Sequence, residues 1–139
     1  MNDNLILDKS FNFSIRVVKL YKYLCENKKE YVLSKQLVRS GTSIGANINE
    51  AQAGQSKADF IAKMCIASKE ARETKYWINL LIKTDYLDKD ETHVQSIVDD
   101  IDEINKHNKK LSKQNLNFSR TWVENRWKII QNSKFKIQH

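Results

Sequence analysis

Apolar residues recur at intervals of three and four residues along four segments of the chain. This spacing places them on one face of an α-helix. The pattern predicts helices over residues 8–28, 34–54, 56–82 and 88–111. The segments are similar in length and their connections are short, which makes neighbouring helices antiparallel. We therefore predict an all-α fold, an antiparallel up-down-up-down four-helix bundle.

Residues that can cap a helix precede three of these segments. Ser34 is the predicted N-cap of the second helix, and Ser56 and Asp88 are those of the third and fourth. Asp59 and Glu91 follow the last two at the capping-box position. These signals favour helix starts at the positions that the apolar spacing indicates.

Two glycines, Gly41 and Gly45, lie one turn apart inside the second segment. Glycine in a helix interior costs about 1 kcal/mol relative to alanine. We interpret the pair as a site at which another backbone comes close to this helix.

The first segment is apolar on two opposite faces. One face carries Phe11, Ile15, Val18 and Cys25, and the other carries Phe13, Val17, Leu20 and Leu24. A helix of this kind needs two partners, the bundle core and either a neighbouring subunit or the C-terminal tail. The third segment also has an apolar strip beside its core face. We predict an oligomer interface formed by Phe13, Val17, Leu24, Ile66, Trp77 and Leu80.

The fourth segment carries a heptad seam that includes one polar residue. Val94, Ile97, Ile101 and Ile104 alternate by three and four, and Asn108 and Leu111 continue the series. An asparagine on such a seam can fix helix register or oligomer state. The alternative is a solvated residue near the helix end.

A stripe of small and polar residues runs along the second segment. It consists of Gln36, Ser40, Ser43, Asn47 and Glu50. One interpretation is a binding surface. The other is a strip of hydrogen bonds between helices, since buried polar groups need partners and thereby fix how helices align. We favour the structural interpretation.

Composition agrees with a helical globular protein and adds a positive charge. The 139 residues include no proline, 40% are hydrophobic, and the net charge is +7. A basic surface is typical of contact with nucleic acid, an anionic membrane or an acidic partner, or of a solvated lysine-rich face. No stretch is long and apolar enough to span a membrane, and no signal peptide is visible. We predict a cytoplasmic protein without membrane contact.

Residues 116–139 differ from residues 1–115, which hold the predicted bundle. The segment has five basic residues and one acidic residue, with aromatic residues between them. It is either a short fifth helix packed on the bundle or a tail that becomes ordered on a partner. The predicted organisation is therefore a bundle over 1–115 and a basic aromatic extension over 116–139.

Residues for catalysis or metal binding are not clustered in the sequence. His93, His107 and His139 are far apart, and the Glu-x-x-His element of di-iron bundles is absent. The chain also has no glycine loop for phosphate and no nucleophile with a base nearby. We predict no enzymatic activity, no metal and no cofactor.

Two segments carry a family resemblance. Gln36-Leu37-Val38-Arg39-Ser40 and the following Ser43-Ile44-Gly45-Ala46-Asn47-Ile48-Asn49-Glu50 resemble the signature of the bacterial 23S rRNA intervening-sequence proteins. A later match comprises Phe60, Ala67-Ser68-Lys69-Glu70-Ala71, Glu73, Trp77, Leu80 and Tyr86-Leu87. Together they cover most of residues 10–113.

The resemblance implies a four-helix protomer that assembles into a ring-like homopentamer. Some members are encoded within large-subunit rRNA genes. A related protein, the accessory variability determinant of diversity-generating retroelements, is a basic pentamer that works with a reverse transcriptase and RNA.

These observations predict a non-enzymatic oligomeric accessory protein that binds nucleic acid, RNA rather than DNA, through a basic surface. The alternative is a protein–protein scaffold without a nucleic-acid ligand. The candidate phosphate contacts are Lys35, Arg39, Lys69, Arg72, Lys75, Arg120, Arg126 and Lys128. Trp122 or Trp127 would stack on unpaired bases or, alternatively, pack the tail onto the bundle.

Overall fold

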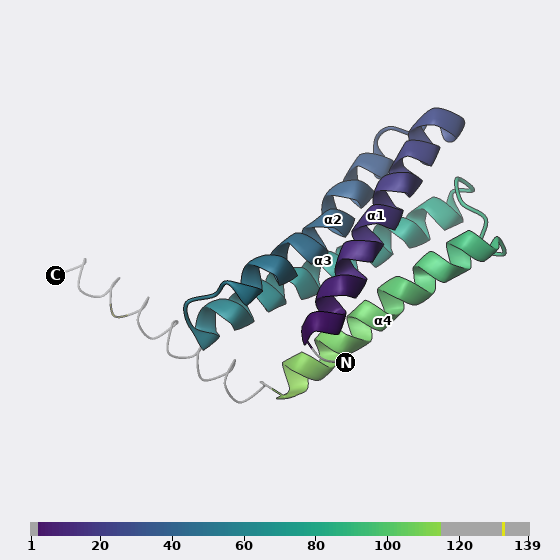
Figure 1. Cartoon of the computed structure of the whole chain (residues 1–139). Coiled ribbons are helices and arrows are strands. Elements are labelled where there is room, and N and C mark those ends of the chain that lie inside the picture. Colours follow the sequence, from purple (N-terminus) through teal and green to yellow (C-terminus); the bar gives the residue numbers. More distant parts are fainter. Residues whose placement is uncertain (1–2, 115–131, 133–139) are drawn as a thin grey trace. The chain divides into compact units, whose positions relative to one another are not determined.

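Four long helices make up the described part of the chain (Figure 1). They are α1 (Asp3–Lys28), α2 (Leu33–Gln52), α3 (Lys57–Lys83) and α4 (Thr92–Gln114). The computed structural model describes residues 3–114 and residue 132. The predicted all-α four-helix bundle is confirmed. The predictions for the basic extension, including Arg120, Trp122, Arg126, Trp127 and Lys128, lie outside the described residues.

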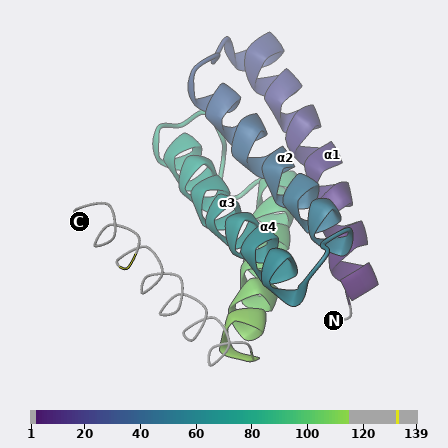
Figure 2. The same ribbon diagram turned by 90° about the vertical axis from the view of Figure 1, so that its left-hand side faces the viewer.

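Consecutive helices run in opposite directions, as predicted (Figure 1), and ion pairs join the first helix to the last. Lys9 and Arg16 of α1 pair with Glu103 and Asp100 of α4. Viewed from the side, α3, α2 and α1 lie next to one another and α4 passes behind α3 (Figure 2). The core between the helices contains fully buried side chains from each of them, among them Phe13, Leu24, Leu37, Ile44, Ile78 and Ile101.

The two glycines of α2 mark its close contact with α1, and the predicted approach of another backbone is confirmed at Gly45. A Cβ atom added at Gly41 would lie 2.7 Å from Cγ1 of Val17. At Gly45 it would lie 3.2 Å from the backbone oxygen of Ser10 and 3.2 Å from the hydroxyl of Ser14. The backbone of Ser10 therefore comes close to Gly45, whereas the Val17 side chain fills the space beside Gly41.

The start of α2 differs from the prediction, because Glu30 rather than Ser34 caps it. The Glu30 carboxylate accepts hydrogen bonds from the backbone N–H groups of Val32 (3.0 Å), Leu33 (2.8 Å) and Ser34 (2.6 Å). Ser34 is buried inside the helix, and its hydroxyl donates to the Glu30 carbonyl (2.8 Å). A carboxylate satisfies three N–H donors that a single hydroxyl cannot, which explains the error.

The N-cap prediction is correct for α3 but not for α4. The hydroxyl of Ser56 accepts a hydrogen bond from the N–H of Asp59 (3.1 Å), so the predicted N-cap of α3 is confirmed. The predicted N-cap Asp88 is wrong, because α4 begins only at Thr92. Asp88 instead accepts from the N–H of Asp90 (2.9 Å) within the turn that precedes the helix.

The Glu30 cap predicts a pH-dependent contribution to stability. Burial acts to raise the pKa of Glu30, but the hydrogen bonds from Leu33, Ser34 and Val32 outweigh it and lower the pKa below its ordinary value of 4.5. A lowered pKa means that folding favours the ionised form. The stabilisation is therefore complete above 4.5 and is lost as the pH falls through the folded-state pKa.

We expect Glu30→Gln to lower the free energy of unfolding by about 1–3 kcal/mol at neutral pH, since it removes charge-assisted hydrogen bonds. The difference from the wild type should close in acid, which urea unfolding at about pH 7 and about pH 3 would measure. Glu26→Gln, at an exposed position of α1, is the matched control. A difference that persists unchanged in acid would contradict the proposed role of the carboxylate.

The seam of α4 is buried from Val94 to Asn108. Val94, Ile97, Ile101 and Ile104 face the core, and Asn108 is only 3% exposed. The interpretation of Asn108 as a solvated residue is therefore wrong.

None of the helices, over the residues described, is long and apolar enough to cross a membrane.

Candidate nucleic-acid interface

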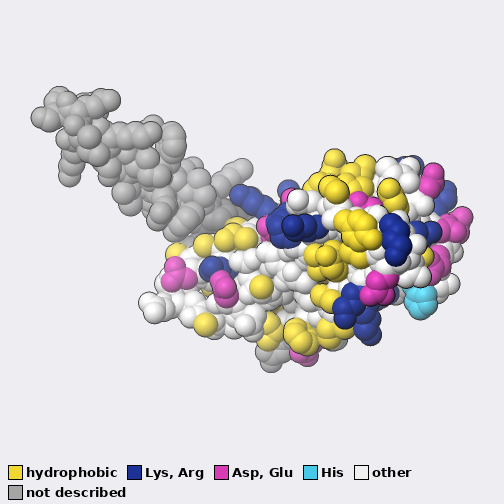
Figure 3. Space-filling view, turned by 90° about the horizontal axis from the view of Figure 1, so that it is seen from above, with side chains coloured by type: hydrophobic (Ala, Val, Ile, Leu, Met, Phe, Trp, Pro, Cys, Tyr) yellow, Lys and Arg dark blue, Asp and Glu magenta, His cyan; other side chains and the backbone are white. Residues whose placement is uncertain are grey.

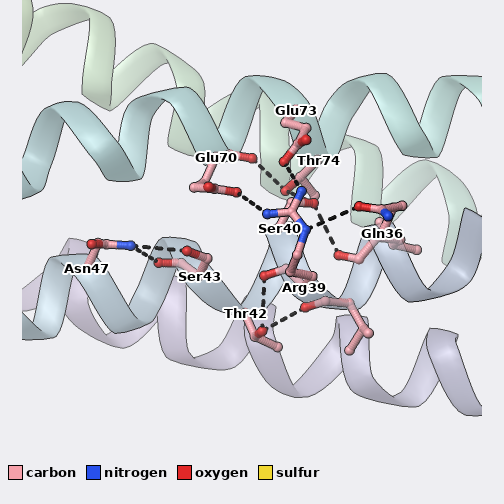
Figure 4. A network of polar contacts seen from close by, with 11 residues as sticks. Gln36, Arg39, Ser40, Thr42, Ser43, Asn47, Glu70, Glu73 and Thr74 are labelled. Atoms are coloured by element: carbon pink, nitrogen blue, oxygen red, sulfur yellow. Dashed lines mark hydrogen bonds and ion pairs between the residues drawn. The ribbon is translucent and has the colours of Figure 1, made fainter.

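The polar stripe of α2 lies along α3 (Figure 4). The hydroxyls of Ser40 and Thr74, both fully buried, are hydrogen bonded across the two helices (3.0 Å). Further along, the Glu50 carboxylate pairs with the Lys63 ammonium (2.7 Å). These contacts join α2 to α3 at two levels and fix their antiparallel register.

Two members of the stripe bond within α2 itself. The Asn47 amide donates to the backbone oxygen of Ser43 (2.8 Å) and to its hydroxyl (3.1 Å). This geometry differs from the expected contact of Asn47 with hydrogen-bond donors of another helix. The short side chain reaches the carbonyl one turn earlier, so among the described residues Asn47 bonds within α2 rather than to a neighbouring helix.

Arg39 is the centre of an ionic cluster between α2 and α3 (Figure 4). Its guanidinium pairs with Glu73 and with Glu70 (3.4 Å), and its Nε donates to the side-chain oxygen of Gln36 (3.2 Å). The hydrogen bond to Glu73 raises the pKa of Arg39. Burial raises the pKa of Glu70; the charge of Arg39 opposes this effect, and the charge of Glu73 adds to it. The charge of Arg39 is thus already balanced within the protomer.

The five candidate phosphate contacts on the bundle fall into two groups. Arg39 is balanced by its glutamates, and Lys75 pairs with Asp102 of α4. Lys35, Lys69 and Arg72 are exposed, and within the described part of the chain no ion pair involves them. The structure therefore leaves these three cations available to an anionic ligand.

Half of the predicted oligomer interface is wrong. Phe13, Val17 and Leu24 are 0–1% exposed in the single protomer, so they form its core and cannot contact a second subunit. The two faces of α1 were assigned in reverse. Ile66 is 41% exposed, and Trp77 and Leu80 are half-buried, so the α3 part of the prediction stays a prediction.

The exposed apolar face of α1 is the surface that the sequence-based assignment missed. Phe11, Ile15 and Val18 are 66%, 41% and 36% exposed. Phe11 borders a groove of about 530 Å³ between α1 and α2, which Ser14 and Gly45 also line. Ser10 and Ser14 could have indicated the correct face, since small residues belong where α1 meets the glycines of α2.

One face of the described bundle brings apolar and basic groups together. Hydrophobic side chains gather there, with lysine and arginine side chains at their border (Figure 3).

Among the described residues, no three or more His, Cys, Asp or Glu side chains form a group that could hold a metal ion.

Comparison with known proteins agrees with the fold and the sequence signature. The family described as 23S rRNA-intervening sequence protein matches residues 2–110. A solved structure of a protein of unknown function from the S23 ribosomal protein family of Bacteroides thetaiotaomicron is similar. It has 53% sequence identity and a TM-score of 0.77, and the match covers 81% of this chain and 99% of that chain. No curated protein is significantly similar. The chain belongs to the family of 23S rRNA-intervening sequence proteins.

Proposed function

We propose that the protein is a non-enzymatic, oligomeric accessory protein that binds RNA through a basic surface. The observation that carries the proposal is the group of three exposed cations on the outside of α2 and α3 that form no ion pair with the described residues. These are Lys35, Lys69 and Arg72. Neutralisation of phosphates by such cations releases counterions, so binding should weaken steeply as the salt concentration rises.

Oligomerisation would multiply this positive surface. Each chain contributes a charge of +7, so copies arranged around a ring would generate a strong attractive field for a polyanion. The basic extension adds Arg120, Arg126 and Lys128 as candidate contacts in each copy. The name of the family supports RNA over DNA as the ligand.

Binding of fluorescently labelled RNA to the full-length protein tests this function. We expect saturable binding at low salt that is lost as salt is added, with weaker binding of duplex DNA of the same length. An absence of RNA binding at low salt would contradict the proposal and would favour the scaffold alternative.

We propose that the oligomer is a homopentamer, the assembly that the family resemblance implies, and that the outer face of α1 contributes to its interface. The support is the row of exposed apolar side chains Phe11, Ile15 and Val18, which a monomer would leave in water. Ile66, Trp77 and Leu80 of α3 are the remaining candidates.

Phe11→Asp is expected to reduce the mass of the assembly to that of a protomer, since it places a charge in a desolvated contact. Light scattering measures the mass, and circular dichroism confirms that the helices persist. The control is Asn12→Asp, which adds the same charge at the next exposed position. A wild type that is monomeric at all concentrations would contradict the assembly proposal.

A further inference from the structure

The outer surface of α3 carries a row of exposed residues at helical spacing. Lys69, Arg72 and Tyr76 follow one another at intervals of three and four residues, which places them on one side of the helix. Lys83 continues the row two turns after Tyr76. The row contains three cations, and the carboxylate beside it, Glu73, is paired with Arg39 of α2.

Tyr76 is the most exposed side chain on α3 among the large hydrophobic residues described. Its side chain is 59% exposed. The ring meets that of Trp77 edge to face, with centroids 5.0 Å apart and planes at 78°. Trp77 is half-buried and therefore gives Tyr76 an aromatic neighbour anchored in the fold. An accessible ring next to such a neighbour is suited to stacking on another planar group.

The cations around this ring lie within reach of a nucleotide stacked on it. Arg72 is one turn away along α3, a rise of about 6 Å, and Lys69 is about 10 Å away. Lys35 of α2 lies close to Tyr76 in height along the bundle. This follows from the antiparallel pairing of α2 and α3, in which Ser40 faces Thr74 and Glu50 faces Lys63. Lys75, beside Tyr76 in sequence, differs from these residues because it is paired with Asp102.

From this arrangement we infer that the outer surface of α3 is a binding site for unpaired nucleotides, in which Tyr76 stacks on a base and Arg72 and Lys69 hold the flanking phosphates. A base within a duplex has both faces covered by its neighbours, so only an unpaired base can use the ring. The inference rests on the proposed RNA binding and specifies the form of RNA that this site takes.

Three substitutions at position 76 test the inference in the full-length protein. Tyr76→Phe keeps the ring, Tyr76→Leu keeps apolar bulk without it, and Tyr76→Ala removes both. The probes are an unpaired oligoadenylate and a blunt-ended RNA duplex with the same number of phosphates. Light scattering of each variant measures its oligomeric state.

We expect Tyr76→Leu and Tyr76→Ala to weaken oligoadenylate binding about 5- to 100-fold, the range measured for removal of a stacked aromatic side chain. Tyr76→Phe should remain within about twofold of the wild type, and duplex binding should change little in all three variants. The mass of the assembly should be unchanged.

Four outcomes would overturn the inference. The first is an oligoadenylate affinity of Tyr76→Leu equal to that of the wild type, and the second is an equal loss of affinity for both probes. The third is a loss of affinity accompanied by a loss of oligomer mass, which would make Tyr76 an interface residue. Each of these results leaves the proposed RNA binding in place. A wild type that binds neither probe removes the proposed function as well.

Discussion

Replacement of Phe13 by alanine is expected to lower the free energy of unfolding of the protomer by about 3–5 kcal/mol, the usual cost of deleting a large aromatic side chain from a core. Phe13 is 1% exposed, between Val17 and Ser10 on the face of α1 that meets the bundle. Few neighbours can move into the vacated volume, because α1 and α2 already approach closely at Gly41 and Gly45.

The matched control is Phe11→Ala, the same change two residues away on the opposite face. Phe11 is 66% exposed, so the stability of the isolated protomer should stay within about 0.5 kcal/mol of the wild type. Urea unfolding of both variants, with a check of their oligomeric mass, measures the contrast. Equal effects of the two substitutions on protomer stability would contradict the assignment of the two faces.

Simultaneous replacement of Lys35, Lys69 and Arg72 by glutamine is expected to weaken RNA binding about 100-fold at about 0.1 M salt. Each phosphate contact with a single strand contributes about 0.7 to the slope of log K against log salt. Three lost contacts should therefore reduce the slope by about 2. A salt titration of affinity, measured by fluorescence anisotropy, gives both quantities.

The control for the triple variant removes a cation without changing net charge. Arg39→Gln combined with Glu73→Gln dissolves the ion pair between α2 and α3 while the charge of the chain remains +7. We expect RNA affinity and salt slope to stay close to the wild type, and stability to fall by less than about 1 kcal/mol because the pair is partly exposed. A slope that falls equally in both variants would contradict the distinction between paired and unpaired cations.

The helices of this protein follow from its apolar spacing, but the orientation of α1 does not. With apolar residues on both sides, periodicity alone is satisfied whether Phe11 or Phe13 faces the core. The choice depends on which side offers small residues to the glycines of α2, and that is a property of two helices together. The cap at Glu30 was missed because glutamate, unlike Ser, Thr, Asp and Asn, is not a common N-cap residue.

The sequence predicted which residue types form the candidate site but not which of its cations form ion pairs. Helical spacing indicates that Lys69 and Arg72 share a face, and the structure shows both exposed. No local pattern shows that Arg39 meets Glu70 and Glu73, or that Lys75 meets Asp102, because these pairs link different helices. Tyr76 was missed because an exposed aromatic residue cannot be distinguished from a core residue by its type.

The most direct test of RNA binding by this basic surface is photo-crosslinking of the full-length protein to RNA that contains 4-thiouridine, with the sites mapped by mass spectrometry. We predict crosslinks in the peptides of α3 that carry Lys69, Arg72 and Tyr76, and their loss at high salt. A protein that binds RNA without crosslinks in α3, or that binds no RNA, would contradict the account.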